Sequence, residues 1–318
     1  MFSRLGIGIT DKCSAACEMC CFGCSPAGKR TLSRELMMDV IRQAGEAEEI
    51  RSVGFSGGEA FLYFDLLLEC TAYAHAQGLK VSVNSNGFWG KNEKRAREML
   101  RELKTAGMGL ICFSADTYHQ QYVPLEDLRT AMRLTHEAGI EVDLSIMRTA
   151  QPDGIVYVAE ALRPEIYDAT VTYYPMLPVG KALENMKEAD FVDSIRTQAA
   201  RCTFNGIVTL CFDGNYYMCC SQFCTDIPRL KLGTPGEMTL RDAETRVASD
   251  DYLYVMLMNG FGWYADQARA LGYDIPERVC TACHCCYLIF RNEKLLEDLK
   301  ERVEEEAGRL RIQHLLGQ

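Results

Sequence analysis

The sequence lacks a hydrophobic segment long enough to cross a membrane. A transmembrane helix needs about 20 consecutive, mostly apolar residues, and one of the longest apolar runs here covers only residues 252–258. The N-terminal segment also lacks the apolar core of a secretory signal peptide. We therefore expect a cytoplasmic protein with no membrane span.

Positive charge is scarce as well. The 318 residues include 34 Lys and Arg against 44 Asp and Glu, which gives a net charge of −10. Binding to nucleic acid or to an anionic membrane surface depends on clustered basic side chains, so we expect neither partner. The chain also has no Walker A or GxGxxG motif, which argues against the common nucleoside triphosphate and dinucleotide sites.

Cysteine, by contrast, is abundant, with 16 residues. The chain has a globular composition and enough length to form a core without disulfides. Without a sign of export, clustered cysteines indicate metal ligands more often than disulfides. Two clusters, one near each end of the chain, predict two metal sites. The first contains Cys13, Cys17, Cys20, Cys21 and Cys24, and the second contains Cys202, Cys211, Cys219, Cys220, Cys224, Cys280, Cys283, Cys285 and Cys286.

Strand and helix patterns alternate between the two clusters. Six βα repeats in about 175 residues require a parallel sheet with right-handed crossovers. Curled, such a sheet is a partial (β/α)6 barrel of the TIM-like α/β class, with its chemistry at the C-terminal ends of the strands. We expect strands at 5–10, 53–56, 79–84, 110–114, 140–146 and 168–174, and helices at 34–44, 62–77, 92–105, 125–137 and 153–162.

Small and polar residues follow the first four expected strands. In chain order they are Cys13, then Gly57-Gly58-Glu59, then Ser85-Asn86-Gly87, then Ser114-Ala115-Asp116. Because the carboxyl ends of parallel strands meet at one edge of a sheet, these residues are predicted to surround the mouth of the barrel.

The spacing Cys13-x3-Cys17-x2-Cys20 predicts an iron–sulfur site after the first strand. A [4Fe–4S] cluster normally has four cysteine ligands, so three thiolates leave one iron open for an exogenous ligand. One alternative is a zinc site with Cys21 or Cys24 as a fourth ligand. The other is a set of buried, apolar cysteines.

These motifs in this order resemble the radical S-adenosylmethionine (SAM) superfamily. The resemblance implies that Cys13, Cys17 and Cys20 hold a [4Fe–4S] cluster whose open iron binds SAM. It also implies that Gly57 and Gly58 let the backbone approach the SAM methionine, while Glu59 accepts a hydrogen bond from its ammonium group. Four more SAM contacts are implied: Ser85, Asn86, Ser114 and Asp116. Taken singly, the glycines fit a turn, and the Ser and Asp residues fit helix caps.

The second cluster of cysteines begins with Cys202-x11-Gly214-x4-Cys219 and continues with Cys280-x2-Cys283. Asp213-Gly214 is a hairpin signal, and the hairpin would bring Cys202 and Cys219 together. The first part resembles the SPASM/Twitch extensions of radical SAM enzymes, which implies one auxiliary [4Fe–4S] cluster held by these four cysteines. A structural zinc site is the alternative. We therefore expect a barrel at residues 1–195 and a SPASM/Twitch-like domain with C-terminal helices at 196–318.

Local sequence blocks narrow the resemblance further. They resemble radical SAM epimerases that convert L- to D-residues in ribosomally synthesised peptides: CCFGCSP, FSGGEAFLYF, SNGFWG, SADTYHQQYV, YPMLPVGKA and MCCS. The implied reaction is removal of a Cα hydrogen by a 5′-deoxyadenosyl radical, followed by return of hydrogen from the thiol of Cys220. Cys211, Cys224, Cys285 and Cys286 are extra to the pattern. The implied partners are a precursor peptide and an electron donor such as flavodoxin or ferredoxin.

The position of Cys220 agrees with this role. Successive side chains of a strand point to opposite faces, so Cys219 can face a cluster while Cys220 faces the barrel. The alternative is that Cys220 is a small buried hydrophobic residue.

Two rival enzyme functions remain: a maturase that forms thioether or carbon–carbon cross-links in a peptide, and a sulfatase-type maturase that oxidises Ser or Cys. The non-enzyme alternative is a zinc or electron-carrier protein.

Overall fold

The computed structural model describes residues 2–148, 153–204 and 206–316, and it contains one large sheet and one small one. The large sheet has the strand order β10-β9-β8-β1-β2-β3-β4-β5-β6. Its strands are β1 (Arg4–Gly8), β2 (Ser52–Ser56), β3 (Lys80–Ser85), β4 (Met108–Ala115), β5 (Glu141–Arg148), β6 (Thr170–Pro175), β8 (Ile207–Leu210), β9 (Tyr216–Tyr217) and β10 (Lys231–Gly233). The small sheet pairs β7 (Ile195–Arg196) with β11 (Arg278–Val279).

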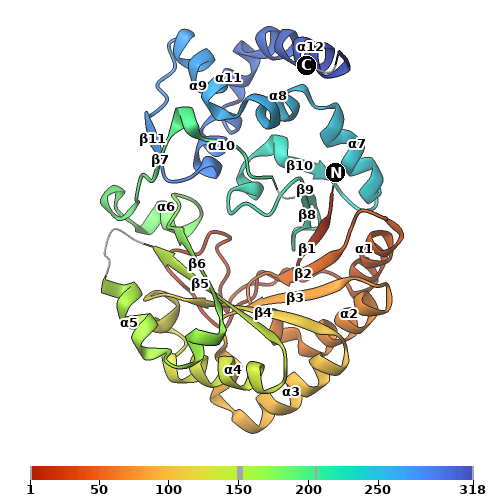
Figure 1. Ribbon diagram of the computed structural model, residues 1–318, viewed down its shortest axis with the longest axis vertical. Helices are drawn as coiled ribbons and strands as arrows, with labels where there is room; N and C mark the ends of the chain where they lie inside the picture. Colours follow the sequence, from red (N-terminus) through yellow and green to blue (C-terminus); the bar gives the residue numbers. More distant parts are fainter. Residues whose placement is uncertain (1, 149–152, 205, 317–318) are drawn as a thin grey trace.

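Strands β1 to β6 pair in parallel, each with the next along the chain. Their connecting helices cover the outside of the curved sheet, as Figure 1 shows. These helices are α1 (Arg34–Glu46), α2 (Phe64–Ala76), α3 (Glu93–Thr105), α4 (Leu125–Glu137) and α5 (Asp153–Ala161). Helix α6 (Lys181–Asn185) follows β6. Short 3₁₀ helices used below are η1 (Ala60–Tyr63), η2 (Phe88–Lys91) and η3 (His119–Gln121).

The C-terminal part adds strands to the same sheet and then a group of helices. Strand β8 pairs in parallel with β1, and β9 and β10 continue the sheet in antiparallel pairs. The helices are α7 (Leu240–Ser249), α8 (Asp251–Asn259), α9 (Phe261–Ala270), α10 (Ala282–Phe290), α11 (Glu293–Asp298) and α12 (Lys300–Leu315). In Figure 1 they lie together above the barrel. No helix in the described parts of the chain combines the length and apolar character that a membrane crossing requires.

Local sequence signals explain where the barrel helices begin and end. The hydroxyl of Ser33 accepts a hydrogen bond from the backbone N–H of Leu36 and caps α1. Asn92 caps α3 in the same way through Arg95. Such caps satisfy backbone donors that have no partner inside the helix. Gly107 and Gly139, after α3 and α4, have φ angles of +99° and +71°, a region that glycine enters without steric cost.

The predicted α/β class and the partial barrel are confirmed. Helix α4 has the predicted bounds, and the expected hairpin lies between β8 and β9, with Gly214 at a φ of +80°. The helix expected from residue 62 begins differently, because η1 precedes α2. Strand β8 joins the barrel sheet although it lies after the expected domain boundary at residue 195; that boundary stays a prediction.

Two glycines provide a test of the packing between η2 and α4. A Cβ atom at Gly90 would overlap the carbonyl oxygen of Asp127, whereas one at Gly308, inside α12, would meet open space. We expect Gly90→Ala to destabilise the fold by on the order of 1–3 kcal/mol, the usual effect of overpacking. Gly308→Ala should stabilise it by about 0.5–1 kcal/mol, because Ala is the better helix former. Thermal unfolding followed by circular dichroism measures both, and equal shifts would contradict the packing described here.

Candidate functional site

A cavity of about 690 Å³ opens at the carboxyl ends of the barrel strands. It brings together residues that are far apart in the sequence, because β1 to β4 and the segment after β9 all border it. Its lining includes the predicted residues Cys13, Cys17, Cys20, Gly57, Gly58, Ser85, Asn86, Ser114 and Cys220. The motifs that follow four separate strands therefore meet around one space, as their order in the sequence predicts.

The three N-terminal cysteines lie on the loop after β1. Burial raises the pKa of Cys17 to about 12, and the charges of Asp116, Cys20 and Cys13 add to this effect. Burial likewise raises the pKa of Cys13 to about 11. Each thiolate is therefore costly in this pocket when no cation is present. A bound metal centre would remove that cost, because thiolates are its preferred soft ligands.

Cys24 lies beside this group. It forms a hydrogen bond with Cys20, and this bond is the main cause that lowers the pKa of Cys20 to about 6. The sequence left Cys24 open as a possible fourth zinc ligand. Its contact with Cys20 brings a fourth thiol to the site, either as a ligand or as a hydrogen-bond donor to a ligand.

Two glycines hold this loop against the end of β2. Gly57 has a φ of +133°, and a Cβ atom there would lie 2.5 Å from the carbonyl oxygen of Thr10. A Cβ atom at Gly58 would overlap the carbonyl oxygen of Lys12. The backbone N–H of Gly58 donates to Thr10 at 2.6 Å. Both glycines also border the cavity. Their contact with the SAM methionine stays a prediction, and their packing against the loop after β1 is a second reason for glycine at these positions.

Glu59 is buried, with 1% of its surface exposed. Its carboxylate accepts hydrogen bonds from the backbone N–H of Asn86 at 2.8 Å and of Phe61 at 3.1 Å. The hydroxyl of Ser85 donates to both carboxylate oxygens, at 3.1 and 3.2 Å. Glu59 thus connects the end of β2 to the end of β3. Its predicted hydrogen bond to the SAM ammonium group stays a prediction, because all of the partners described here are residues of the protein itself.

Ser85 and Asn86 continue this network. The Ser85 hydroxyl accepts from the indole N–H of Trp89 at 3.0 Å, and Trp89 stacks on Phe61 with 4.9 Å between ring centroids. The Asn86 side-chain amide donates to Ser14 at 3.0 Å and to the sulfur of Cys13 at 3.8 Å. Asn86 thereby connects the third strand end to the cysteine loop. The predicted SAM contacts of both residues remain untested.

The fourth strand end carries Ser114 and Asp116. Ser114 borders the cavity, whereas the carboxylate of Asp116 is bonded to the residues that directly follow it in the sequence. It accepts from the backbone N–H groups of Tyr118 at 3.0 Å and His119 at 2.9 Å, and it lies 2.8 Å from Nδ1 of His119. Burial opposes the charged imidazole, but the carboxylate beside it raises the pKa of His119 overall.

His119 is a site residue to which the sequence analysis gave no role. Its side chain borders the cavity, and Asp116 sets its orientation. The spacing Asp116-x2-His119 was the available signal, because residues three apart in one turn of chain can pair. The predicted ligand contact of Asp116 stays a prediction, and His119 is the nearer of the two to the cavity space.

The second set of cysteines is divided between two segments. Cys202 precedes the β8–β9 hairpin and Cys219 follows it, whereas Cys280 follows β11 and Cys283 lies in α10. Burial and then the charges of Cys220, Cys283 and Cys202 raise the pKa of the Cys219 thiol. The charges of Cys202 and Cys283 therefore act on the Cys219 thiol, while the predicted role of these cysteines as cluster ligands stays a prediction. The sulfur of Cys280, by contrast, lies 3.7 Å from a carboxylate oxygen of Asp193.

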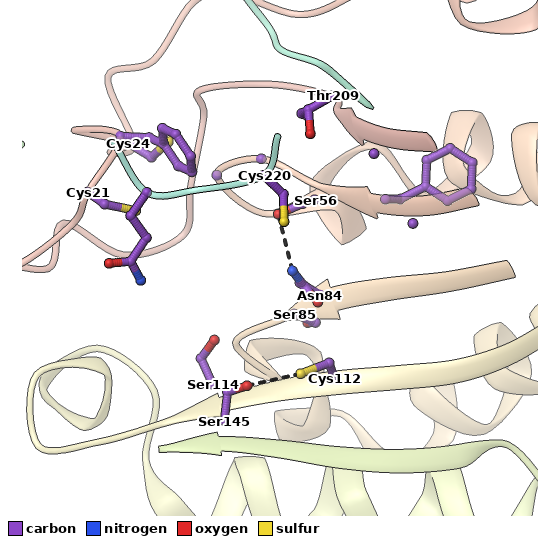
Figure 2. A pocket seen from close by; sticks show the side chains of 18 of the residues that line it. Cys21, Cys24, Ser56, Asn84, Ser85, Cys112, Ser114, Ser145, Thr209 and Cys220 are labelled. Atoms are coloured by element: carbon purple, nitrogen blue, oxygen red, sulfur yellow. Dashed lines mark hydrogen bonds between the residues drawn. The ribbon is translucent and has the colours of Figure 1, made fainter. Parts of the chain in front are cut away.

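Cys220 differs from Cys219 in the space that it faces. Cys220 borders the barrel cavity, while Cys219 is not part of the described lining. Figure 2 shows Cys220 and Ser56 on one side of the cavity, with Cys112, Ser114 and Ser145 on the other. The amide of Asn84 reaches the Ser56 hydroxyl at 3.4 Å between them.

The buried Glu59 carboxyl predicts a pH effect on stability. Burial raises its pKa from 4.5 to about 7, although the bonds from Asn86, Phe61 and Ser85 favour the charged form. Between these two pH values the folded state keeps a proton that the unfolded state loses, so stability falls as pH rises across this window. We expect a weaker fall in Glu59→Gln, measured by thermal unfolding between pH 4.5 and 7. His119→Gln, tested in parallel, separates the contribution of the imidazole. The same slope in Glu59→Gln and the wild type would contradict this prediction.

The comparisons with known proteins agree with this geometry. Residues 7–156 match the family described as the Radical SAM superfamily. The chain is 23% identical over 296 residues to the putative peptide biosynthesis protein YydG of Bacillus subtilis (strain 168), a match that covers 91% of this chain and 92% of YydG.

Two solved structures show the same fold. The structure of native anSMEcpe with bound AdoMet and Cp18Cys peptide has a TM-score of 0.59 at 16% identity, and the match covers 98% of this chain and 100% of anSMEcpe. That of Streptococcus suis SuiB bound to the precursor peptide SuiA has a TM-score of 0.57 at 16% identity, and the match covers 82% of this chain and 67% of SuiB.

The superfamily implies SAM and a [4Fe–4S] cluster, and the residues present fit both. Three soft thiol ligands meet at a cavity that also contains the glycines and amide of the expected SAM contacts. The cysteines beyond residue 200 are consistent with an auxiliary cluster. Residues 7–156, which match the Radical SAM superfamily, therefore form a radical SAM domain.

Proposed function

We propose that this enzyme is a peptide epimerase, which converts L- to D-residues in a ribosomally synthesised peptide. The observation that carries the proposal is the thiol of Cys220, which borders the same cavity as Cys13, Cys17 and Cys20. The names of the relatives, a peptide biosynthesis protein and enzymes bound to peptides, support a peptide as the substrate class. The proposed location is the cytoplasm.

Cys13, Cys17 and Cys20 would hold the cluster, and with SAM bound it would supply a 5′-deoxyadenosyl radical able to take the Cα hydrogen of a substrate residue. The side chains around the substrate then determine which group returns a hydrogen atom to the carbon radical, and from which face. Hydrogen returned to the opposite face inverts the centre. Cys220 is suited to return it, because it borders the cavity, where partial desolvation raises the pKa of its thiol and so favours the S–H form. A thiolate would have no hydrogen atom to give.

The balance of the reaction requires one further electron. Transfer of the hydrogen atom breaks the S–H bond of Cys220 and forms a Cα–H bond, and it leaves a sulfur-centred radical on the protein. One electron and one proton restore the thiol. Cys219, the neighbouring residue, belongs to the second set of cysteines, so an auxiliary cluster there would be a short-range source of that electron. Flavodoxin or ferredoxin is the proposed donor of electrons from outside.

The second candidate function is cross-linking of a peptide through a thioether or carbon–carbon bond. It uses the same radical chemistry and the same cavity, and the likeness to peptide-bound structures supports both functions equally. The two differ in mass, because epimerisation leaves the peptide mass unchanged whereas a cross-link removes two hydrogens. Oxidation of a Ser or Cys by a sulfatase-type maturase also removes two hydrogens.

Replacing the proposed donor tests the function. Thiols exchange with solvent, so a peptide epimerised in D₂O should gain one deuterium at the inverted Cα. Cys220→Ala should still cleave SAM but lose D-residue formation, because alanine has no S–H bond from which a hydrogen atom can return to Cα. D/L amino-acid analysis and mass spectrometry measure these results.

Two further variants complete this experiment. Cys70→Ala, in the buried core of α2, should epimerise like the wild type. Cys112 borders the cavity on the wall opposite Cys220 and lies 3.2 Å from the Ser145 hydroxyl. If label persisted in Cys220→Ala and disappeared in Cys112→Ala, Cys112 would be the donor. A product that loses two hydrogens would establish cross-linking or oxidation in place of epimerisation.

A further inference from the structure

We propose that the part of the cavity inside the barrel binds the main chain of the peptide substrate, with Thr209 as one of its hydrogen-bonding groups. The proposal rests on the proposed function only for the substrate class, which is a peptide. It adds the place where an extended segment of that peptide lies. It does not depend on whether the peptide is epimerised or cross-linked.

The inner face of the barrel sheet borders this part of the cavity. On β2 the lining residues include Ser52, Gly54 and Ser56, and alternate residues of a strand point to one face of the sheet. Ser82 and Asn84 show the same alternation on β3. Ser52 is the first residue of its strand. The cavity therefore extends from the carboxyl ends of the strands to the point where β2 begins.

The depth of this space fits a chain segment. From Ser56 to Ser52 the strand rises by about 13 Å, at roughly 3.3 Å per residue. Arg4, the exposed first residue of β1, also borders the cavity. An extended peptide covers at most about 3.3–3.6 Å per residue, so about four residues would lie along this depth. A segment of that length has several main-chain amides.

Small residues make up the middle layer of the inner face. Strand register places Gly6 opposite both Thr209 and Gly54. Gly54 in turn lies opposite Ser82. In closed β/α barrels such layers are filled mainly by bulky branched side chains. Two adjacent positions in this layer have no side chain at all, so the layer leaves space inside the barrel.

The backbone conformation does not require glycine at these two positions, because neither Gly6 nor Gly54 has a positive φ angle. A Cβ atom at Gly6 would lie 3.0 Å from Oγ1 of Thr209, and one at Gly54 would lie 3.2 Å from the hydroxyl oxygen of Ser82. Both glycines border the cavity. The missing side chains therefore leave room beside two hydroxyl groups.

Thr209 provides the observation that points to a ligand. Its side chain borders the cavity, and only 9% of the residue's surface is exposed. Its hydroxyl has no hydrogen-bond partner among the residues that the structure describes. Figure 2 shows Thr209 on the same side of the cavity as Cys220 and Ser56. A buried hydroxyl without a partner is costly, so a polar group of a bound substrate is its expected partner.

The polar groups around this space are uncharged. Ser56, Ser82, Asn84 and Thr209 provide hydroxyls and a side-chain amide, and each of these groups can both donate and accept hydrogen bonds. The Asn84 amide reaches the Ser56 hydroxyl at 3.4 Å, a long bond that either group can exchange for one to a substrate. A peptide main chain carries N–H and C=O groups along its length. It therefore matches this wall better than a charged or an apolar side chain does.

The affinity of a peptide tests this site. The probe is a synthetic precursor peptide that the purified enzyme modifies, and its Kd is measured by anaerobic calorimetry with SAM but without a reductant, so that no turnover occurs. Thr209→Val removes the hydroxyl, and we expect binding to weaken by about 2- to 10-fold, the usual contribution of one hydrogen bond. Thr209→Ser keeps the hydroxyl and should bind like the wild type.

The chain offers matched controls for these variants. Thr71 in α2 also has a buried hydroxyl without a described partner, but it is not part of the cavity lining. Thr71→Val should therefore leave peptide affinity unchanged. Gly54→Val fills the middle layer and should weaken binding more than Thr209→Val, whereas Gly109→Val, at an exposed position of β4, should not. Gly54→Ala replaces Gly54→Val if circular dichroism shows that the valine variant does not fold.

Backbone esters distinguish the main chain of the peptide from its side chains. Near the modified residue, one amide at a time is replaced by an ester, which removes its N–H donor and weakens its carbonyl acceptor. At least one ester should weaken binding to the wild type and have a smaller effect on Thr209→Val, because both changes remove the same hydrogen bond. Alanine replacements of polar side chains in the peptide should show no such coupling.

Several results would overturn the inference. Wild-type affinity in folded Thr209→Val and Gly54→Val variants would do so, and so would an equal loss of affinity in Thr71→Val. Coupling of Thr209 to a polar side chain of the peptide, or to none of the esters, would exclude the main-chain contact. A cross-linked or oxidised product would contradict the proposed epimerase, but it would leave these affinities valid because they are measured without turnover.

Discussion

The buried carboxylate of Glu59 is the interaction on which the shape of the site depends. It lies at the end of β2 and accepts hydrogen bonds from Ser85 and the backbone of Asn86 at the end of β3. Asn86 in turn reaches Ser14 and Cys13 on the loop after β1. Three strand ends are thereby joined through one side chain. A buried carboxylate is costly without such partners, so the network and the position of the cysteine loop depend on each other.

The fold was predictable because its signals are local. Periodic apolar residues predicted α4 at its observed bounds. The helix ends are local as well, because Ser33 and Asn92 cap α1 and α3, and Gly107 and Gly139 follow α3 and α4 with positive φ angles. The meeting of Cys13, Gly57, Ser85 and Ser114 around one cavity also followed from chain order, because parallel strands end at one edge. None of these inferences needed the position of a distant side chain.

Hydrogen-bond partners within the site could not be predicted in this way. Asp116 and Glu59 carry carboxylates at the expected strand ends, yet each accepts from its own chain, Asp116 from Tyr118 and His119, and Glu59 from Phe61 and Asn86. Which donors a carboxylate finds depends on rotamers and neighbouring loops, and a motif does not specify these.

The hairpin of β8 and β9 explains how one short segment can serve two sites. Extended backbone turns adjacent side chains to opposite faces, so Cys219 can join the thiols of Cys202 and Cys283 while Cys220 reaches the barrel cavity. Because β8 pairs directly with β1, the hairpin is continuous with the strand whose loop carries Cys13. The distance between the two groups of thiols is then set by sheet geometry, not by a flexible linker between domains. A rigid connection of this kind would suit the proposed epimerisation, in which a hydrogen atom must be delivered before the substrate radical reacts elsewhere.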